Sequence, residues 1–465
     1  MRPQRKHHAG TPAPDGNDTF APVTLPWATS SDIGTPRPPE SAPGEAADGR
    51  IEGFTSTGAV APGTSIDFHV TVEPPRPLRI DVHRIGHHDG HGATAMTSSP
   101  LLPGLTQLPP LAAGRTVSCH HWWLSWRLAV PSYWNVGAYV AVLTTADGRH
   151  RAHIPFTVRD DRPADLLLVL PDITWQAYNP YPAADAGASL AAHDDQGRPR
   201  DGTDAVTTVS FDRPYAGDGL PPQAGHAYDV IRWAERYGYD LAYADARDLH
   251  AGRIDPTRYR GLVFPGHDEY WTTEMRTVVE DARERGTSLV FLSARTLHRQ
   301  VELAPAPSGP DRLLTCGRRR GQNGPALWRE HDRAEQQLLG IQYAGRVPRP
   351  RPLIVRNSDH WMWEATGAHE GDALDGMVAG GADRYHPRTP LPDHEERVLL
   401  AHSPYGDRQG ARRHQETSLY RAPSGAWVFA SGTLAWSPAL DRPGHTEPRV
   451  QRATANLLDR ICKRD

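Results

Sequence analysis

The stretch Gly261-Leu-Val-Phe-Pro-Gly-His-Asp-Glu-Tyr-Trp271 is the best guide to the fold. Its first part, Leu262 to Phe264, is an unbroken apolar run that predicts a buried strand. Five side chains with polar or aromatic groups, His267 to Trp271, follow this strand directly. Because ligands bind beyond the carboxyl ends of the strands in open α/β sheets, this cluster is the first candidate site. On an extended segment, His267 and Glu269 point the same way.

A helix is expected immediately after this cluster. Met275, Val278, Val279 and Ala282 recur at helical spacing, and Gly286 supplies a stop. From residue 165 onward, apolar strands alternate with such helices. The alternation predicts that residues 165–465 form a doubly wound α/β domain with a mostly parallel sheet, similar to Rossmann-like or glutamine-amidotransferase-like folds.

Residues 49–160 show a different period. Apolar residues alternate with polar ones from Ile66 to Val72, from Leu78 to Val82 and from Ile154 to Val158, and Pro and Gly separate these runs. The pattern predicts a β-sandwich of immunoglobulin-like size. Residues 159–163 are hydrophilic and form the expected linker.

Composition limits the remaining possibilities. Residues 1–48 are rich in Pro, Gly, Ser and Thr and are expected to form a disordered or extended leader. The 51 basic and 55 acidic residues give a net charge of −4, which argues against a nucleic-acid partner. The sequence contains no apolar run of 18 residues, so no membrane span is expected. Cys119, Cys316 and Cys462 are widely spaced, as expected for reduced thiols in a cytoplasmic protein.

Three polar segments follow strands or loops of the predicted α/β domain. They are Thr174 to Asn179, Ser210 to Tyr215 and His267 to Trp271. Together they offer a carboxylate, an imidazole and several phenols, and hard oxygen donors favour a hard cation such as Fe(III). A metal-bound water could attack a carbonyl group there.

A purely structural interpretation of the same residues stays open. Trp175 and Trp271 would cap the sheet, Tyr178 and Tyr270 would be half-buried hydrogen-bonding aromatics, and Asp268 would cap a helix. Two further clusters, His87 to His91 and Cys119 to Trp123, carry metal-binding residue types, but their spacing does not bring four ligands together. Cys316 lies in an Arg-rich loop, so a thiol nucleophile is not expected.

The sequence resembles the large, beta-subunit type of N,N-dimethylformamidase from about residue 51 to residue 465. The resemblance is carried by the following segments: Ile51-Glu-Gly-Phe54, Ala61-Pro-Gly63, Thr174-Trp-Gln-Ala-Tyr-Asn179, Phe211-Asp-Arg-Pro-Tyr215, Ile231-Arg-Trp-Ala-Glu-Arg-Tyr-Gly-Tyr239, Gly266-His-Asp-Glu-Tyr-Trp271 and Gly425-Ala-Trp-Val-Phe-Ala430. The Gly-His-Asp-Glu-Tyr-Trp string is the most specific of them.

The resemblance implies an amidohydrolase that cleaves the C–N bond of a small amide. It implies a single iron, expected as Fe(III), held by two tyrosines and a glutamate, with a histidine nearby. By position the glutamate is Glu269, the histidine is His267 and the tyrosines are Tyr178 and Tyr215. The family also implies a possible small partner subunit, or a homo-oligomer.

Two positions depart from the family pattern. Arg295 stands where relatives carry an asparagine, and Gly381 stands where they carry a glutamate. Arg295 brings a fixed positive charge beside the expected iron, where it would grip a substrate or weaken metal binding. The sequence therefore leaves two hypotheses: an active iron-dependent amidohydrolase, or a catalytically degenerate member that binds a ligand or serves in assembly.

Overall fold

A seven-stranded sheet lies at the centre of the molecule. The computed structural model describes residues 49–182, 189–193, 199–200, 207–221, 223–317 and 326–463, so the expected leader, residues 1–48, lies outside the described residues. The order of the strands in the central sheet is β15 (Leu241–Asp245), β11 (Leu166–Leu170), β16 (Gly261–Phe264), β18 (Ser288–Phe291), β25 (Trp427–Ala430), β24 (Arg412–Arg421) and β23 (Glu396–Gly406). The first five strands are parallel to one another, β24 runs antiparallel to β25, and β23 runs antiparallel to β24.

The predicted doubly wound α/β domain is wrong. Among the described residues, strands account for 39% and helices for only 19%. A doubly wound sheet needs a helix after nearly every strand, whereas the described residues between β18 and β25 contain six strands and only one short α-helix. The parallel strands have the continuous apolar sequences of a doubly wound sheet, so the sequence pattern alone did not distinguish the two arrangements.

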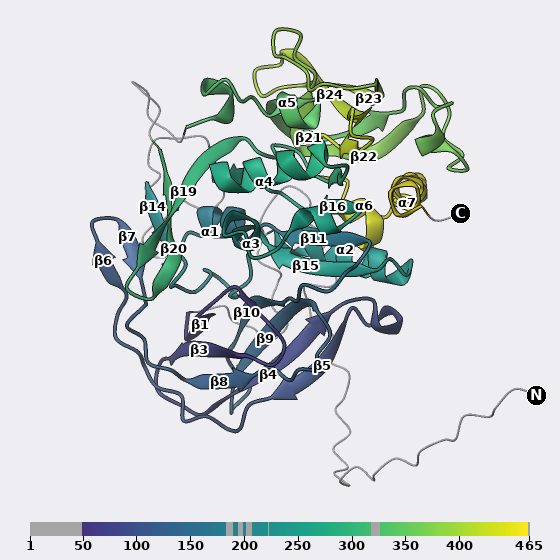
Figure 1. Cartoon of the computed structure of the whole chain (residues 1–465). Helices are drawn as coiled ribbons and strands as arrows, with labels where there is room; N and C mark the ends of the chain where they lie inside the picture. The colour runs from purple at the N-terminus through teal and green to yellow at the C-terminus, as the bar shows by residue number, and fades with distance from the viewer. Residues whose placement is uncertain are drawn as a thin grey trace, which may run out of the picture.

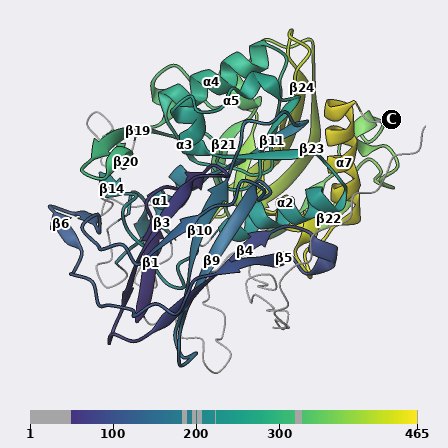
Figure 2. The same cartoon turned by 60° about the horizontal axis from the view of Figure 1, so that its bottom comes forward.

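The segment between β18 and β25 forms long hairpins instead of crossover helices. β19 (Arg299–Ala306) pairs with β20 (Gly309–Cys316), and β21 (Gln342–Ile354) pairs with β22 (Ala373–Arg384). The remaining short strands are β6 (Leu111–Ala113), β7 (Thr116–Ser118), β12 (Ala192–His193), β13 (Pro199–Arg200), β14 (Thr208–Ser210) and β17 (Tyr270–Trp271). Figure 2 shows β19 and β20 on the side of the molecule opposite α7 (Pro448–Cys462).

The N-terminal strands form two sheets that share one core. One sheet contains β1 (Ile51–Thr55), β3 (Ser65–Val72) and β8 (Trp126–Ala129), and the other contains β2 (Ala59–Val60), β10 (Arg151–Val158), β9 (Gly137–Thr145), β4 (Leu78–Ile85) and β5 (Ala93–Ser98). Alternate residues of β3 are buried, as its sequence pattern predicts. Phe68 of one sheet packs against Phe156 of the other. Figure 1 shows this pair of sheets below the parallel strands of the central sheet, and β21 to β24 above those strands.

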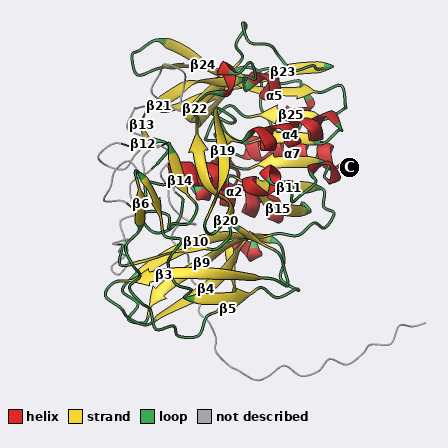
Figure 3. Cartoon of the chain, turned by 60° about the vertical axis from the view of Figure 1, so that its left-hand side comes forward, coloured by secondary structure: helices red, strands yellow, loops and turns green. Residues whose placement is uncertain are grey.

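The helices flank the central sheet, as Figure 3 shows. The α-helices are α1 (Asp172–Tyr178), α2 (Ala224–Arg236), α3 (Ala246–His250), α4 (Thr273–Glu284), α5 (Gln336–Leu339), α6 (Pro438–Asp441) and α7, and short 3-10 turns occupy His88–Gly90, Pro256–Arg258, Trp328–Glu330 and Trp361–Trp363. The predicted helix after Trp271 is confirmed as α4, but its cap is Thr272 and not Asp268. In the part of the chain that the structure describes, no helix is long and apolar enough to cross a membrane.

Candidate functional site

Three neighbouring parallel strands deliver the residues of the candidate site to one edge of the central sheet. β11 lies between β15 and β16, and β16 pairs with β18. Tyr178 ends the helix that follows β11, Glu269 lies in the loop after β16, and Arg295 lies just beyond β18. Because parallel strands end at the same edge, residues distant in sequence come together there.

Glu269 is the centre of the cluster. The Tyr178 hydroxyl donates a short hydrogen bond to Oε2 of Glu269. Nε2 of His267 lies 3.3 Å from the same oxygen. Oε1 of Glu269 faces two guanidinium groups, with Nε of Arg299 at 2.7 Å and Nε of Arg295 at 3.0 Å. The Glu269 side chain has no exposed surface, so all four neighbours act on a fully buried carboxylate.

The charges of the cluster fix the protonation of its acid and its phenol. Burial raises the pKa of Glu269, but Arg295, His267 and Arg299 outweigh burial and hold that pKa well below its usual range. Burial raises the pKa of Tyr178 well above its usual value, and the charge of Arg295 offsets this only in part. At neutral pH Glu269 is therefore an anion, and Tyr178 is a neutral donor to it.

His267 is held by a neighbour on its far side. Its Nδ1 lies 2.6 Å from Oε1 of Gln223, which assigns the ring proton to Nδ1. Its Nε2, on the other side of the ring, faces Oε2 of Glu269. Apart from this approach, the buried Nε2 has no hydrogen-bond partner among the described residues. A proton on Nε2 that is donated to Glu269, or a cation bound by both atoms, would satisfy this pair.

Arg295 is held in an unusual backbone conformation. Its φ angle is +60°, which is rare for residues other than glycine, asparagine and aspartate. Its backbone N–H donates to Oδ1 of Asp383 at 2.9 Å, and its guanidinium lies 4.9 Å from the centre of the Tyr343 ring. A Cβ added at Gly381 would lie 3.3 Å from Cβ of Ala294, so both departures from the family pattern lie side by side.

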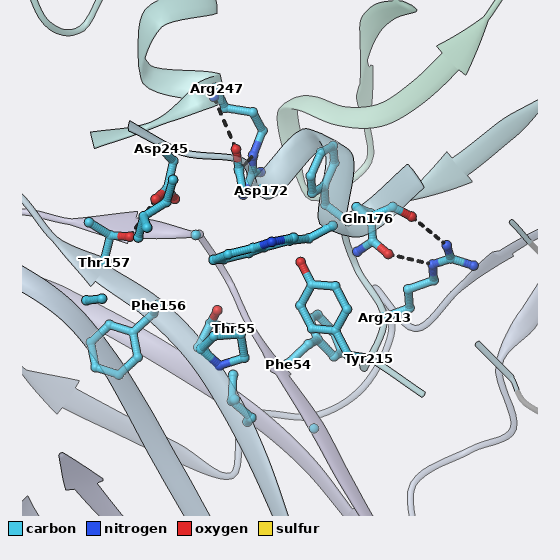
Figure 4. A pocket seen from close by; sticks show the side chains of 18 of the residues that line it. Phe54, Thr55, Phe156, Thr157, Asp172, Gln176, Arg213, Tyr215, Asp245 and Arg247 are labelled. Carbon is cyan, nitrogen blue, oxygen red and sulfur yellow. Dashed lines mark hydrogen bonds and ion pairs between the residues drawn. The ribbon is translucent and has the colours of Figure 1, made fainter. Parts of the chain in front are cut away.

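Tyr215 is not brought into this cluster. It lines a separate pocket between α1 and the N-terminal sheets, where Figure 4 shows its hydroxyl pointing toward the centre. Burial raises the pKa of Tyr215, with Asp172, Arg247, Asp245 and Arg213 as the charged groups that act on it. None of these groups contacts Glu269 in the described part of the chain. The predicted second tyrosine therefore belongs to a different environment.

The other predicted candidates do not form metal sites. His87 to His91 and Cys119 to His121 are described, yet neither segment supplies three His, Cys, Asp or Glu ligand atoms within 4.8 Å of one another. Burial raises the pKa of Cys119 to about 12, so this thiol is unreactive at neutral pH. All three cysteines are free and buried.

The sequence prediction missed two residues of the cluster, Arg299 and Gln223. Arg299 is the first residue of β19, and its position four residues after Arg295 was the available signal. Because β19 pairs with β17, Arg299 lies opposite Tyr270 and next to Glu269. Gln223 precedes α2 and carried no sequence signal, because it lies more than forty residues from His267.

Comparison with known proteins supplies the family. No curated protein matches the chain. Residues 79–450 match the family model described as N,N-dimethylformamidase beta subunit-like, C-terminal. This range includes every member of the Glu269 cluster and confirms the resemblance carried by the sequence motifs. The chain belongs to the N,N-dimethylformamidase beta subunit-like family.

Proposed function

We propose that the chain is an amidohydrolase that cleaves the C–N bond of a small amide at a single iron ion bound by the Glu269 cluster. The observation that carries the proposal is the convergence of the Tyr178 hydroxyl and Nε2 of His267 on one oxygen of a buried carboxylate. Family membership supports the reaction class.

The donors fit an iron ion in part. A phenolate and a carboxylate are hard oxygen ligands, which suit Fe(III), and imidazole is a further iron ligand. Tyr178, Glu269 and His267 would hold the ion, which would polarise the amide carbonyl and acidify a bound water. Tyr215, which lies in a separate pocket, is left out of this ligand set.

The remaining residues would orient a ligand and contact the substrate. Gln223 accepts the Nδ1–H of His267 and so leaves Nε2 to bind the ion. The side chains of Arg295 and Arg299 are 18% and 17% exposed, whereas that of Glu269 is fully buried. The two arginines therefore lie nearest to solvent and would contact a substrate that enters the cluster.

The test is iron content measured together with amide turnover. The chain is purified from iron-replete cells, and iron per chain, the visible phenolate-to-iron band and amine release from N,N-dimethylformamide and other small amides are measured. Glu269→Gln and Tyr178→Phe should lose the iron and the band. Glu335→Gln is the matched control, because Glu335 is equally buried and pairs with His298 and Arg329.

Two outcomes would contradict parts of the proposal. A folded wild-type chain without iron and without turnover would overturn it. Loss of iron in Tyr215→Phe would show that the two-tyrosine set is used, and the ligand set with His267 would be wrong.

A second candidate function is a catalytically degenerate member that binds a ligand or serves in assembly. The observation that favours it is that Arg295 and Arg299 already neutralise Glu269, which weakens the attraction of that carboxylate for a cation. The same measurements separate the two functions, because a degenerate member would bind amides or carboxylates without releasing amine.

An assembly with a small partner subunit or with further copies of the chain is also part of the proposal. It is supported by the family description as a beta subunit. Residues 101–124, between β5 and β8, include large exposed apolar side chains, which are Leu101, Leu105, Leu108, Leu111, Trp123 and Leu124. Where such side chains gather into a patch, they commonly mark an interface. The three free cysteines support a reducing, cytoplasmic location.

A further inference from the structure

A second group of metal-ligand side chains lies on the edge hairpin of the central sheet, in β23 and β24. His402 of β23 is paired directly with Glu416 of β24, and His414 lies two residues before Glu416 on the same strand. Since side chains two residues apart point to the same face of a strand, all three share one face.

The distances suit one small ion. Nδ1 of His402 lies 3.0 Å from Oε1 of Glu416, and Nε2 of His414 lies 3.6 Å from that oxygen. Ligands at about 2.0–2.1 Å from a tetrahedral zinc ion are about 3.3 Å apart. In the described ranges this is the only group of three or more His, Cys, Asp or Glu residues whose ligand atoms all lie within 4.8 Å.

The surroundings support coordination. Oε2 of Glu416 accepts the backbone N–H of Tyr385 at 2.7 Å, which fixes the orientation of the carboxylate. The His402 and His414 side chains are 46% and 28% exposed, so water has access to the remaining coordination positions.

Two cations near the hairpin limit the affinity. Arg384 interacts electrostatically with His414, and Arg397 interacts electrostatically with Glu416. Arg397 donates to the Gly340 carbonyl at 3.1 Å and lies over the Tyr385 ring, so its guanidinium is held by other groups. With one carboxylate and two imidazoles as ligands, we expect micromolar rather than nanomolar binding.

We propose that His402, His414 and Glu416 form a binding site for a divalent transition-metal ion such as Zn²⁺, separate from the Glu269 cluster. Imidazole and carboxylate ligands suit zinc. The ion joins the edge strand β23 to β24 and leaves at least one position to water. The site does not depend on the proposed amidohydrolase function, because it shares no residue with that cluster.

The experiment is a zinc titration of the tag-free chain after chelator treatment. Free Zn²⁺ is followed with a chromophoric chelator, and the melting temperature is measured with and without Zn²⁺. The wild-type chain should bind one more equivalent than His402→Ala/His414→Ala, with a dissociation constant on the order of 10 µM. Zinc should raise the melting temperature of the wild-type chain but not that of the double variant, since only a ligand of the folded state stabilises it.

Three further variants complete the test. His369→Ala removes a histidine that is 83% exposed on another loop, and it should bind as much zinc as the wild-type chain. Glu416→Gln keeps an acceptor for the Tyr385 N–H and should lose the extra equivalent, which covers the case in which the double variant does not fold. Glu269→Gln should keep that equivalent. Equal stoichiometry in the wild-type chain, the double variant and Glu416→Gln would overturn the proposal.

Discussion

At the scale of single residues, the charged groups around Glu269 decide both its protonation and its affinity for a cation. One oxygen of its carboxylate accepts from Tyr178 and faces His267, while the other faces Arg295 and Arg299. The arginines keep the carboxylate ionised in a place where burial alone would protonate it. The same charges oppose a metal ion, so the number of arginines sets the affinity of the site for a cation.

Replacing Arg295 with asparagine should increase iron binding. A unit charge about 5 Å from an ion contributes about 3 kcal/mol at an effective dielectric constant of about 20. We therefore expect Arg295→Asn to bind iron at least ~10-fold more tightly than the wild-type chain. Iron titration of the chelator-treated variants measures the change.

Arg299→Gln provides the comparison for Arg295→Asn. It removes the same charge from Oε1 of Glu269 but does not alter the residue with positive φ, whose strain asparagine would relieve. Both variants should gain affinity if charge is the cause. A loss of iron in both would instead mean that the arginines support the bound state.

Glu52 should make the stability of the chain depend on pH. Burial raises the pKa of Glu52 to about 7, and the hydrogen bond from Tyr181 offsets burial only in part. The stability that goes with protonated Glu52 is fully present below the unfolded pKa, near 4.5, and is lost as pH rises through about 7. Between pH 5 and pH 8 the wild-type chain should lose on the order of 2 kcal/mol from this group.

Urea unfolding at the two pH values measures this loss for Glu52. Glu52→Gln cannot ionise, so its stability should fall less over the same range. Glu302→Gln changes an exposed glutamate and should behave as the wild-type chain does. An unchanged pH dependence in Glu52→Gln would assign the effect to other buried acids.

The predictability of the site also depends on individual residues. His267 and Glu269 were predicted to point the same way because they are two apart on an extended segment, and they lie 3.3 Å apart. Tyr178 reaches Glu269 because β11 and β16 are parallel neighbours. Tyr215 follows β14, which pairs with β20 outside the central sheet. The order of the strands in the central sheet therefore could not predict the position of Tyr215.

At the scale of elements, α4 shows which features a sequence specifies locally. Its apolar spacing and its stop at Gly286 lie within one continuous segment, and Met275, Val279 and Ala282 are buried as expected. The hairpin β21–β22 lacks such a signal. Much of β21 is exposed or half-buried without strict alternation, and its paired residues in β22 lie 19 to 42 positions downstream. The pairing of β21 with β22 therefore depends on tertiary contacts, which the spacing of apolar residues along the sequence does not indicate.

The N-terminal cap of α4 should be measurable in the stability of the chain. Oγ1 of Thr272 accepts the Met275 N–H at 3.2 Å, and the Thr272 side chain is fully buried. Thr272→Ala removes this acceptor and should cost about 1–2 kcal/mol in the free energy of unfolding. Chemical denaturation measures the loss. Thr277→Ala, an exposed change on the same helix, should stay within about 0.5 kcal/mol of the wild-type chain.

At the scale of the whole molecule, Glu235 connects the N-terminal sheets to the central sheet. Its carboxylate accepts from Arg84 of β4 at 2.6 Å, from the His87 backbone at 2.9 Å and from Tyr243 of β15 at 3.1 Å. No strand lies between β10, which ends at Val158, and β11, which begins at Leu166. The two parts of the chain, whose boundary is proposed near residues 160–165, are therefore held rigidly together by side-chain contacts of this kind.

Glu235→Ala should uncouple the two parts of the chain. The change leaves the Arg84 guanidinium, only 12% exposed, without its carboxylate, at a cost of about 3 kcal/mol. In calorimetry the N-terminal sheets should then melt before the central sheet, and trypsin should cut after Arg159. Glu284→Ala removes a surface ion pair and should change neither result. A single transition at lower temperature, without cleavage, would mean that the two parts unfold together, because their buried contacts outweigh the lost ion pair.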